Sequence, residues 1–359
     1  MKQVILIFIA FLFISITLCA QDKKSQEPVG PFPYVSEDIK FKNEIDSVML
    51  AGTLTMPAEG DNFPVAVLIS GSGPQDRNSE LLGHKPFLVI ADYLTRQGLA
   101  VLRVDDRGTA DSEGEYNETG LDGFVRDTEF AVSYLKTRKE INQAQIGLIG
   151  HSLGGIIAPM IASKSQDIGF VIMLAGPGMR GDKLMLLQKE KIERQMGVND
   201  EAIADGQKNI GGAYEIIIDS DPQSDTLDVQ LKSYFKDAFG GALPETQVNM
   251  ISEQLSVPWL VGLIRHDPKE SFINVKCPVL ALNGVNDLQV PAEENLTLIE
   301  AGITANGNED VKVVALPGLN HLFQESESGS PNEYGTLEQT FSPEVLKMMS
   351  DWILEMVEK

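Results

Sequence analysis

The chain has 359 residues, of which 43% are hydrophobic and 23% are charged, a composition typical of a globular protein and not of a disordered one. Its formal net charge of −23 would repel a polyanion, which argues against nucleic acid or an anionic membrane surface as a partner. Two cysteines are too few for a disulfide-stapled scaffold or a multi-cysteine zinc site.

The first twenty residues have the pattern of a secretory signal peptide. Lys2 precedes the apolar run Val4–Leu18, and Ala20 comes just before a polar segment. We therefore expect cleavage after Ala20 and export to the periplasm or the extracellular space, with no stable membrane association. Two alternatives stay open. The apolar run could be an uncleaved membrane anchor, since its length is near the lower limit for spanning a membrane. Cys19 could instead carry a lipid, although the bulky residue before it disfavours this.

A polar, proline-bearing linker or tail is expected over residues 21–37. Alternating polarity at 38–42 and 48–56 then predicts a hairpin. From there to residue 178, short apolar runs alternate with helical patterns, which predicts parallel β-α-β units with helices on both faces of a sheet. The predicted strands of this first part of the core, 38–178, are 65–70, 100–104, 146–149 and 170–174, and its predicted helices are 86–97, 123–137 and 154–163.

The strand rhythm stops over residues 179–271. This segment has helical patterns such as 183–196 and acidic or glycine-bearing turns at 200–205, 219–225 and 240–245, but no run suited to a central strand. Because it is too long for a simple loop, we expect a helical cap inserted into the core. Strands at 277–282 and 311–316 and a last helix from Ser342 complete the core over 272–359. The expected fold class is α/β, with a mostly parallel central sheet.

A nucleophile is predicted at Ser152. Gly150-His151-Ser152-Leu153-Gly154 matches G-x-S-x-G, with a predicted strand before it and a small-residue helix after it, as a nucleophile elbow requires. The N-terminus of that helix favours a developing oxyanion, so the backbone N–H of Leu153 is expected in the oxyanion hole. We expect the His151 side chain to point away from the nucleophile.

A serine hydroxyl needs a general base, and the chain has four histidines. In an α/β-hydrolase the order along the chain is nucleophile, acid, histidine, and the histidine follows the final core strand. Only His321 meets both conditions. His266, in the predicted cap, is the main rival, and His84 lies too early in the chain.

The acid that orients the imidazole is expected after the preceding strand. Asp287 is the first carboxylate beyond 277–282, and Glu293 and Glu294 are possible substitutes. Cys277, in the same predicted strand, has no partner thiol and is expected to pack in the core.

The second oxyanion donor is expected from the glycine-rich loop 70–77, after the first core strand. Ser72 is our choice, and Gly71 or Gly73 could serve instead. As a phosphate-binding loop this segment is a poor match, because no Gly-Lys-Ser/Thr follows it. A structural polar network beneath the site is expected from four charged residues, Asp76, Arg77, Asp106 and Arg107.

Seven segments of the chain match one known family: SGSGPQDRN (70–78), GHKPFLVIADYL (83–94), VLRVDDRG (101–108), IGLIGHSLGG (146–155), MLAGPG (173–178), GLNHLF (318–323) and TFSPEVL (340–346). On these segments, the chain from about Asp38 onward resembles bacterial EstD-type esterases of the α/β-hydrolase superfamily. The resemblance implies Ser152 as nucleophile, Asp287 as acid and His321 as base.

These observations predict an exported serine hydrolase that cleaves small-molecule carboxylic esters through an acyl-enzyme intermediate, with no metal or organic cofactor. A serine aminopeptidase-like enzyme on the same fold is the first rival, and it would need a cap carboxylate to bind the substrate's amino terminus. A non-catalytic binding protein is the second rival, which the complete triad disfavours.

Overall fold

The computed structural model describes residues 24–222 and 225–358. The predicted signal peptide and its cleavage site lie outside the described residues. Within the described ones, every helix is too short or too polar to cross a membrane. In the described part of the predicted linker, residues 24–37, a strand already begins at Tyr34, and the side chains of Lys24 and Gln26 donate hydrogen bonds to carbonyls within 335–341.

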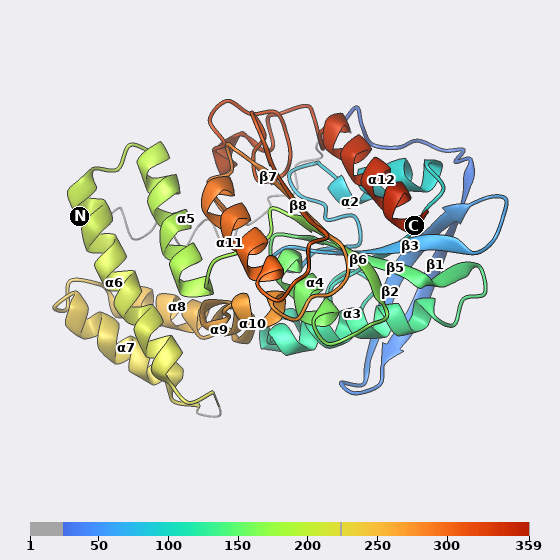
Figure 1. Ribbon diagram of the computed structural model, residues 1–359. Helices are drawn as coiled ribbons and strands as arrows, with labels where there is room; N and C mark the ends of the chain where they lie inside the picture. The colour runs from blue at the N-terminus through green and yellow to red at the C-terminus, as the bar shows by residue number, and fades with distance from the viewer. Residues whose placement is uncertain (1–23, 223–224, 359) are drawn as a thin grey trace. The chain divides into compact units, whose positions relative to one another are not determined.

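The described residues form an eight-stranded sheet with the order β1-β2-β4-β3-β5-β6-β7-β8 (Figure 1). The first two strands make an antiparallel hairpin, β2 pairs antiparallel with β4, and every other neighbouring pair is parallel. The strands are β1 (Tyr34–Asn43), β2 (Val48–Pro57), β3 (Phe63–Ile69), β4 (Ala100–Val104), β5 (Ile141–His151), β6 (Ile168–Leu174), β7 (Val279–Gly284) and β8 (Val311–Leu316).

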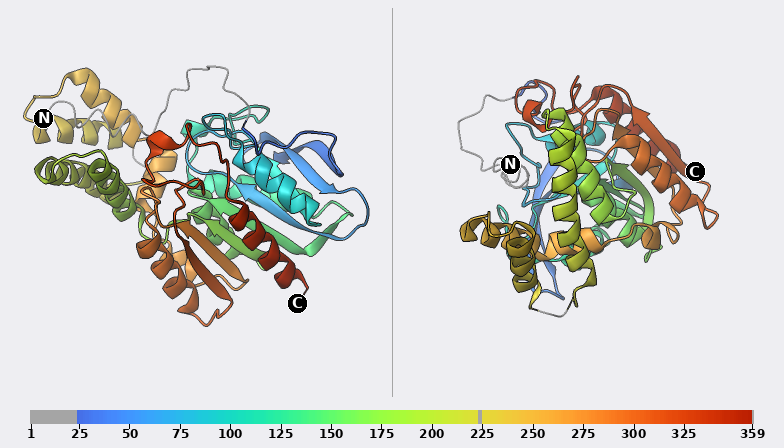
Figure 2. Two further views of the ribbon diagram at one scale, coloured as in Figure 1. Left: turned by 90° about the horizontal axis from the view of Figure 1, so that it is seen from above. Right: turned by 90° about the vertical axis from the view of Figure 1, so that its left-hand side faces the viewer.

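Helices cover both faces of this sheet (Figures 1 and 2). On one face, α2 (Pro86–Arg96) and α12 (Pro343–Val357) bury their apolar stripes against side chains of β3 to β7. On the other, α4 (Gly154–Ala162) packs on β5 and β6, and α11 (Ala292–Thr304) packs on β7 and β8. The short α10 (Lys269–Phe272) contacts both α4 and α11. Because helices bury both faces of the sheet, the sequences of the parallel strands are continuous apolar runs.

The chain divides into two compact units, each with its own apolar interior. The sheet unit comprises residues 24–116, 123–178 and 268–358, and the second unit comprises 117–122 and 179–267. Helix α3 (Leu121–Leu135) begins in the second unit and continues in the sheet unit. The second unit contains helices α5 (Gly181–Gln195), α6 (Asp200–Asp219), α7 (Leu227–Ala238), α8 (Glu245–Leu255) and α9 (Pro258–Arg265).

One predicted turn in the second unit is wrong. Residues 200–205 form the first turns of α6, because the Asn199 side chain accepts a hydrogen bond from the backbone N–H of Ala202. Asp200 and Glu201 lie in the first turn, where the positive end of the helix dipole stabilises acidic side chains. An acidic cluster therefore marks a helix start here and not a loop.

The predicted α/β-hydrolase architecture is confirmed by the sheet and its helices, and each predicted core strand appears within a few residues of its expected position. Cys277 was expected inside a core strand, but it lies just before β7 and is half-buried. Because β3, β5, β7 and β8 run parallel, the loops that follow them meet at one edge of the sheet. The predicted site residues lie in those loops.

Candidate active site

The turn between β5 and α4 holds Ser152 in a strained backbone conformation, with φ of +53°. Glycine is required on both sides of it. A Cβ on Gly150 would lie 2.0 Å from the carbonyl oxygen of Gly154, and a Cβ on Gly154 would lie 2.2 Å from that of Ile69. The strand, the turn and the helix therefore approach one another closely enough to lift the serine hydroxyl out of the sheet.

A continuous series of hydrogen bonds joins the three residues predicted as nucleophile, base and acid. The His321 Nε2 atom lies 3.1 Å from Ser152 Oγ, and His321 Nδ1 lies 2.8 Å from Asp287 Oδ2. The histidine and the aspartate are each only 3% exposed. With Nδ1–H donating to the carboxylate, Nε2 carries a lone pair that can accept a proton from the serine hydroxyl.

Backbone groups fix the acid of this series. The second carboxylate oxygen of Asp287 accepts hydrogen bonds from the backbone N–H groups of Gln289, at 2.7 Å, and Val290, at 2.9 Å. With one oxygen held by the chain and the other facing the imidazole, the carboxylate has little freedom to turn. Glu293 and Glu294, the predicted substitutes, begin α11 instead.

The other predicted histidine candidates lie elsewhere. His84 is buried, with Nδ1 2.8 Å from Thr340 Oγ1 and Nε2 2.9 Å from the carbonyl oxygen of Tyr334, and so connects its own loop to the segment before α12. His266 follows α9 in the second unit. The histidine bonded to the Ser152 hydroxyl is His321.

The His151 side chain, expected to point away from the nucleophile, lies against His321. Its ring packs against that of His321, with centroids 4.9 Å apart, and its Nε2 atom lies 3.0 Å from the His321 carbonyl oxygen. Burial lowers the pKa of His151 to about 3, so the ring is neutral at physiological pH. A carbonyl only accepts, so Nε2–H is the donor in this bond.

The candidate oxyanion donors differ in their availability. The backbone N–H of Gly73 donates to the Tyr116 hydroxyl at 2.8 Å and is therefore occupied. The N–H groups of Leu153, Gly71 and Ser72 make no hydrogen bond within the described part of the chain. Gly71 adjoins the nucleophile, since a Cβ on it would lie 3.3 Å from Ser152 Cβ. Leu153 with either Gly71 or Ser72 is thus the available pair.

The four charged residues predicted to form one network belong to separate groups, so that prediction is wrong. Asp76 caps the turn that follows it by accepting from the backbone N–H of Glu80 at 2.8 Å. Asp106 bonds to the 70–75 loop, and burial raises the pKa of its carboxyl to about 7. The two arginines make ion pairs, Arg77 with Asp105 at 2.5 Å and Arg107 with Asp127 at 2.6 Å.

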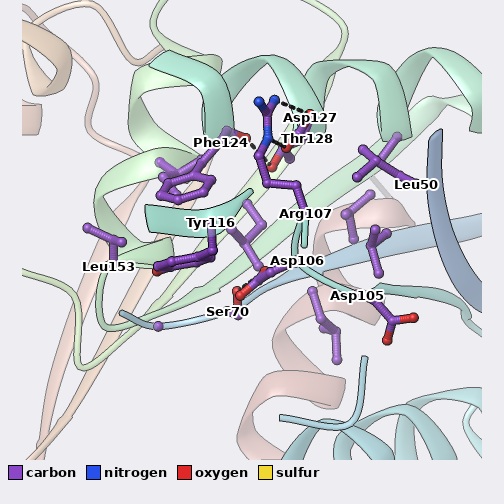
Figure 3. Close-up of a pocket in the computed structure, with 17 residues that line it drawn as sticks. Leu50, Ser70, Asp105, Asp106, Arg107, Tyr116, Phe124, Asp127, Thr128 and Leu153 are labelled. Carbon is purple, nitrogen blue, oxygen red and sulfur yellow. Dashed lines mark hydrogen bonds and ion pairs between the residues drawn. The ribbon is translucent and has the colours of Figure 1, made fainter. Parts of the chain in front are cut away.

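A cavity of about 50 Å³ lies behind the 70–75 loop, with room for a few water molecules. Figure 3 shows Ser70, Asp106 and Tyr116 along one wall of it, near Leu153. Sequence reasoning missed Tyr116 and His151 as neighbours of the site. Asp106, which the sequence placed beneath the site, follows β4, whose carboxyl end lies beside that of β3. Tyr116 carries no comparable sequence signal.

Cys277 is reduced, and burial raises the pKa of its thiol to about 12. A thiol with such a pKa is protonated at neutral pH and unreactive as a nucleophile. It has no part in the site.

Known proteins resemble this chain in sequence and in fold. The chain is 26% identical to Esterase EstD of Thermotoga maritima over 304 residues, which are 84% of this chain and 65% of that esterase. Among solved structures, it resembles the Pyrococcus furiosus esterase Pf2001 (TM-score 0.54, 17% identity, covering 93% of this chain and 98% of that one). It also resembles Est1E of Butyrivibrio proteoclasticus (TM-score 0.52, 17% identity, covering 90% and 99%). These two likenesses bear on the fold alone.

The predicted resemblance to EstD-type proteins of the α/β-hydrolase superfamily is therefore confirmed. In addition, the Hydrolase_4 family model, described as serine aminopeptidase S33, matches residues 86–327, which include Ser152, Asp287 and His321. The chain belongs to this Hydrolase_4 family and has the α/β-hydrolase fold.

Proposed function

We propose that this protein is a serine hydrolase that cleaves carboxylic esters of small molecules. The observation that carries the proposal is the hydrogen-bonded series from Ser152 through His321 to Asp287, with the serine on a strained strand–helix turn. The similarity to Esterase EstD supports esters as the substrate class.

In the proposed acylation step, Ser152 Oγ attacks the ester carbonyl carbon while its proton passes to His321 Nε2. The carbonyl oxygen becomes an oxyanion, held by the N–H of Leu153 and that of Ser72 or Gly71. As the tetrahedral intermediate collapses, Nε2–H protonates the leaving alcohol. Asp287 stabilises the imidazolium that forms in between, while keeping its own negative charge.

Deacylation repeats these steps with water as the nucleophile. His321 Nε2 takes a proton from the water as it attacks the acyl-enzyme carbonyl. The same oxyanion donors hold the second tetrahedral intermediate. The imidazolium then returns the proton to Ser152 Oγ, which leaves as the acid product departs.

A serine aminopeptidase activity is the second candidate, and the description of the matching family favours it. The same three residues can also cleave an amide, so the distinction lies in how the substrate's amino group is bound. A carboxylate placed to bind that amino group would have to supply the binding.

The direct test compares p-nitrophenyl esters of short acids with aminoacyl p-nitroanilides, using wild type and Ser152→Ala. We expect ester turnover that greatly exceeds anilide turnover and that falls by about 10³-fold or more in the variant. Anilide turnover above ester turnover would establish the peptidase alternative. Equal rates for wild type and variant would refute the role of Ser152.

Export remains part of the proposal. We propose that the chain is secreted after cleavage following Ala20. Expression in a bacterial host, followed by N-terminal sequencing of the exported protein, is expected to find Gln21 as the first residue. A mature protein beginning with lipidated Cys19, or one that retains residue 1, would contradict it.

A further inference from the structure

The 70–75 loop, which follows β3 and adjoins the nucleophile, is bound at both ends to one carboxylate. Asp106 Oδ1 accepts from the Ser70 hydroxyl at 2.6 Å, and Asp106 Oδ2 accepts from the backbone N–H of Gln75 at 2.9 Å. The backbone N–H of Asp106 also donates to the Gln75 carbonyl oxygen at 3.0 Å. Asp106 therefore spans the loop and fixes the distance between its two ends.

Tyr116 holds the middle of the same loop. Its hydroxyl accepts the backbone N–H of Gly73 at 2.8 Å, and its ring is only 5% exposed and packs against Phe124 with centroids 4.8 Å apart. Gly73 has φ of +90°, a conformation that favours glycine. A buried, packed ring gives the hydroxyl a definite position, so the peptide before Gly73 is oriented by it.

Gly71 and Ser72 are neighbouring loop residues whose N–H groups this arrangement leaves without an acceptor in the described chain. Gly71 and Ser72 lie between the bonded residue 70 and the bonded residues 73 and 75. Gly71 itself adjoins Ser152. We infer that Asp106 and Tyr116 are positioning residues for the oxyanion hole, which act by holding the loop so that one of these N–H groups faces the developing oxyanion. The inference rests on the proposed function.

An oxyanion hole stabilises the transition state more than the bound substrate, because its donors are aimed at where the negative charge develops. Loss of one donor lowers kcat by about 10²–10³-fold, and a displacement of about 1 Å can cost about 10²-fold. A displaced loop should therefore lower kcat while leaving KM unchanged. If the two residues had only a structural role, their substitution would lower stability without lowering kcat at an unchanged KM.

Tyr116→Phe keeps the buried ring and removes the acceptor for Gly73. Asp106→Ala removes both loop contacts made by the carboxylate. Asp106→Asn is the conservative variant, because its amide oxygen can accept from Gln75 and its amide N–H₂ can donate to the Ser70 hydroxyl. Tyr34→Phe is the matched control, since the Tyr34 hydroxyl also makes a hydrogen bond, to Asp92, on the β1 side of the sheet.

The experiment measures kcat and KM on a p-nitrophenyl ester, together with the affinity for an aryl trifluoromethyl ketone, which forms a tetrahedral oxyanion on the serine. We expect kcat to fall about 10- to 100-fold in Tyr116→Phe and Asp106→Ala, with KM within about twofold and inhibitor affinity falling in the same proportion as kcat. Asp106→Asn should recover most of the loss, and Tyr34→Phe should match wild type.

Unchanged kcat in both Tyr116→Phe and Asp106→Ala would overturn the inference. So would a loss confined to KM, or inhibitor affinity that does not follow kcat. Melting temperatures separate unfolding from mispositioning, and Tyr116→Phe carries the test if Asp106→Ala does not fold. Absence of Ser152-dependent ester turnover in wild type would refute the proposed function itself, which is a different outcome.

Discussion

At the scale of single residues, His151 lies against the candidate base as an uncharged ring. Because burial lowers its pKa to about 3, it stays neutral through the working pH range and donates Nε2–H to the His321 carbonyl. Its ring also packs against the imidazole that would act as base. It therefore fixes both the backbone and the ring of His321.

We predict that His151→Ala lowers kcat/KM about tenfold, because a hydrogen bond of about 1 kcal/mol and a ring contact that hold His321 are lost. His151→Gln, whose amide can donate to the same carbonyl, should recover part of the activity. Since the ring does not titrate above its low pKa, the ratio of wild type to His151→Ala should be constant from pH 5 to 9. A ratio that changes across this range would contradict the neutral role.

Asp287→Asn should retain the fold and lose activity. The amide oxygen can still accept from the N–H groups of Gln289 and Val290, so the loop after β7 keeps its bonds. The amide N–H₂ then faces His321, which favours the wrong imidazole tautomer. We expect kcat to fall about 10³- to 10⁴-fold with an unchanged circular dichroism spectrum. Activity within tenfold of wild type would refute Asp287 as the acid.

The residues of the site were predictable to different degrees. Ser152, Asp287 and His321 follow from a short motif and from chain order, because each is a local feature placed after a strand. His151 and Tyr116 act through contacts with residues 170 and 43 positions away in the chain. Such contacts depend on tertiary packing, and no local pattern encodes them.

At the scale of elements, the strand–turn–helix around Ser152 tolerates no side chain at its glycines. Gly154→Ala would bring a Cβ within 2.2 Å of the Ile69 carbonyl oxygen, which is backbone of the central strand β3 and cannot move aside. We predict a loss of about 3 kcal/mol in the free energy of unfolding, measured by urea titration.

Gly211→Ala is the matched control for that substitution. Gly211 lies inside α6, where the nearest atom to an added Cβ is a Leu186 methyl carbon at 3.9 Å. Alanine should therefore stabilise the helix, by about 0.5–1 kcal/mol. Equal effects of the two substitutions would contradict the steric explanation.

The elements differ in how well sequence predicts them. Core strands are short apolar runs buried on both faces, and β4 and β8 have the predicted bounds. The segment that forms the second unit has weaker signals, because its helices have mixed faces and acidic starts. Asp200–Asp205 is the clearest error, because the hydrogen bond that the Asn199 side chain accepts from the Ala202 N–H caps a helix at a segment that was predicted to be a turn.

At the scale of the whole molecule, the formal net charge of −23 should affect which esters react fastest. Negative substrates are repelled at long range, and salt screens this repulsion. We predict that kcat/KM for a p-nitrophenyl hemisuccinate, relative to that for the neutral butyrate, rises several-fold between about 10 mM and 500 mM NaCl. A ratio independent of salt would show that the net charge does not act on substrate.

The proposed mechanism requires an activated serine at position 152. Its most direct test is the intact mass and peptide map of the protein after reaction with diethyl p-nitrophenyl phosphate, which transfers a phosphoryl group to a serine nucleophile and releases p-nitrophenolate. We predict one adduct, located on Ser152, in wild type and none in Ser152→Ala or His321→Ala. An adduct on another residue, or undiminished labelling of Ser152 in His321→Ala, would contradict the account.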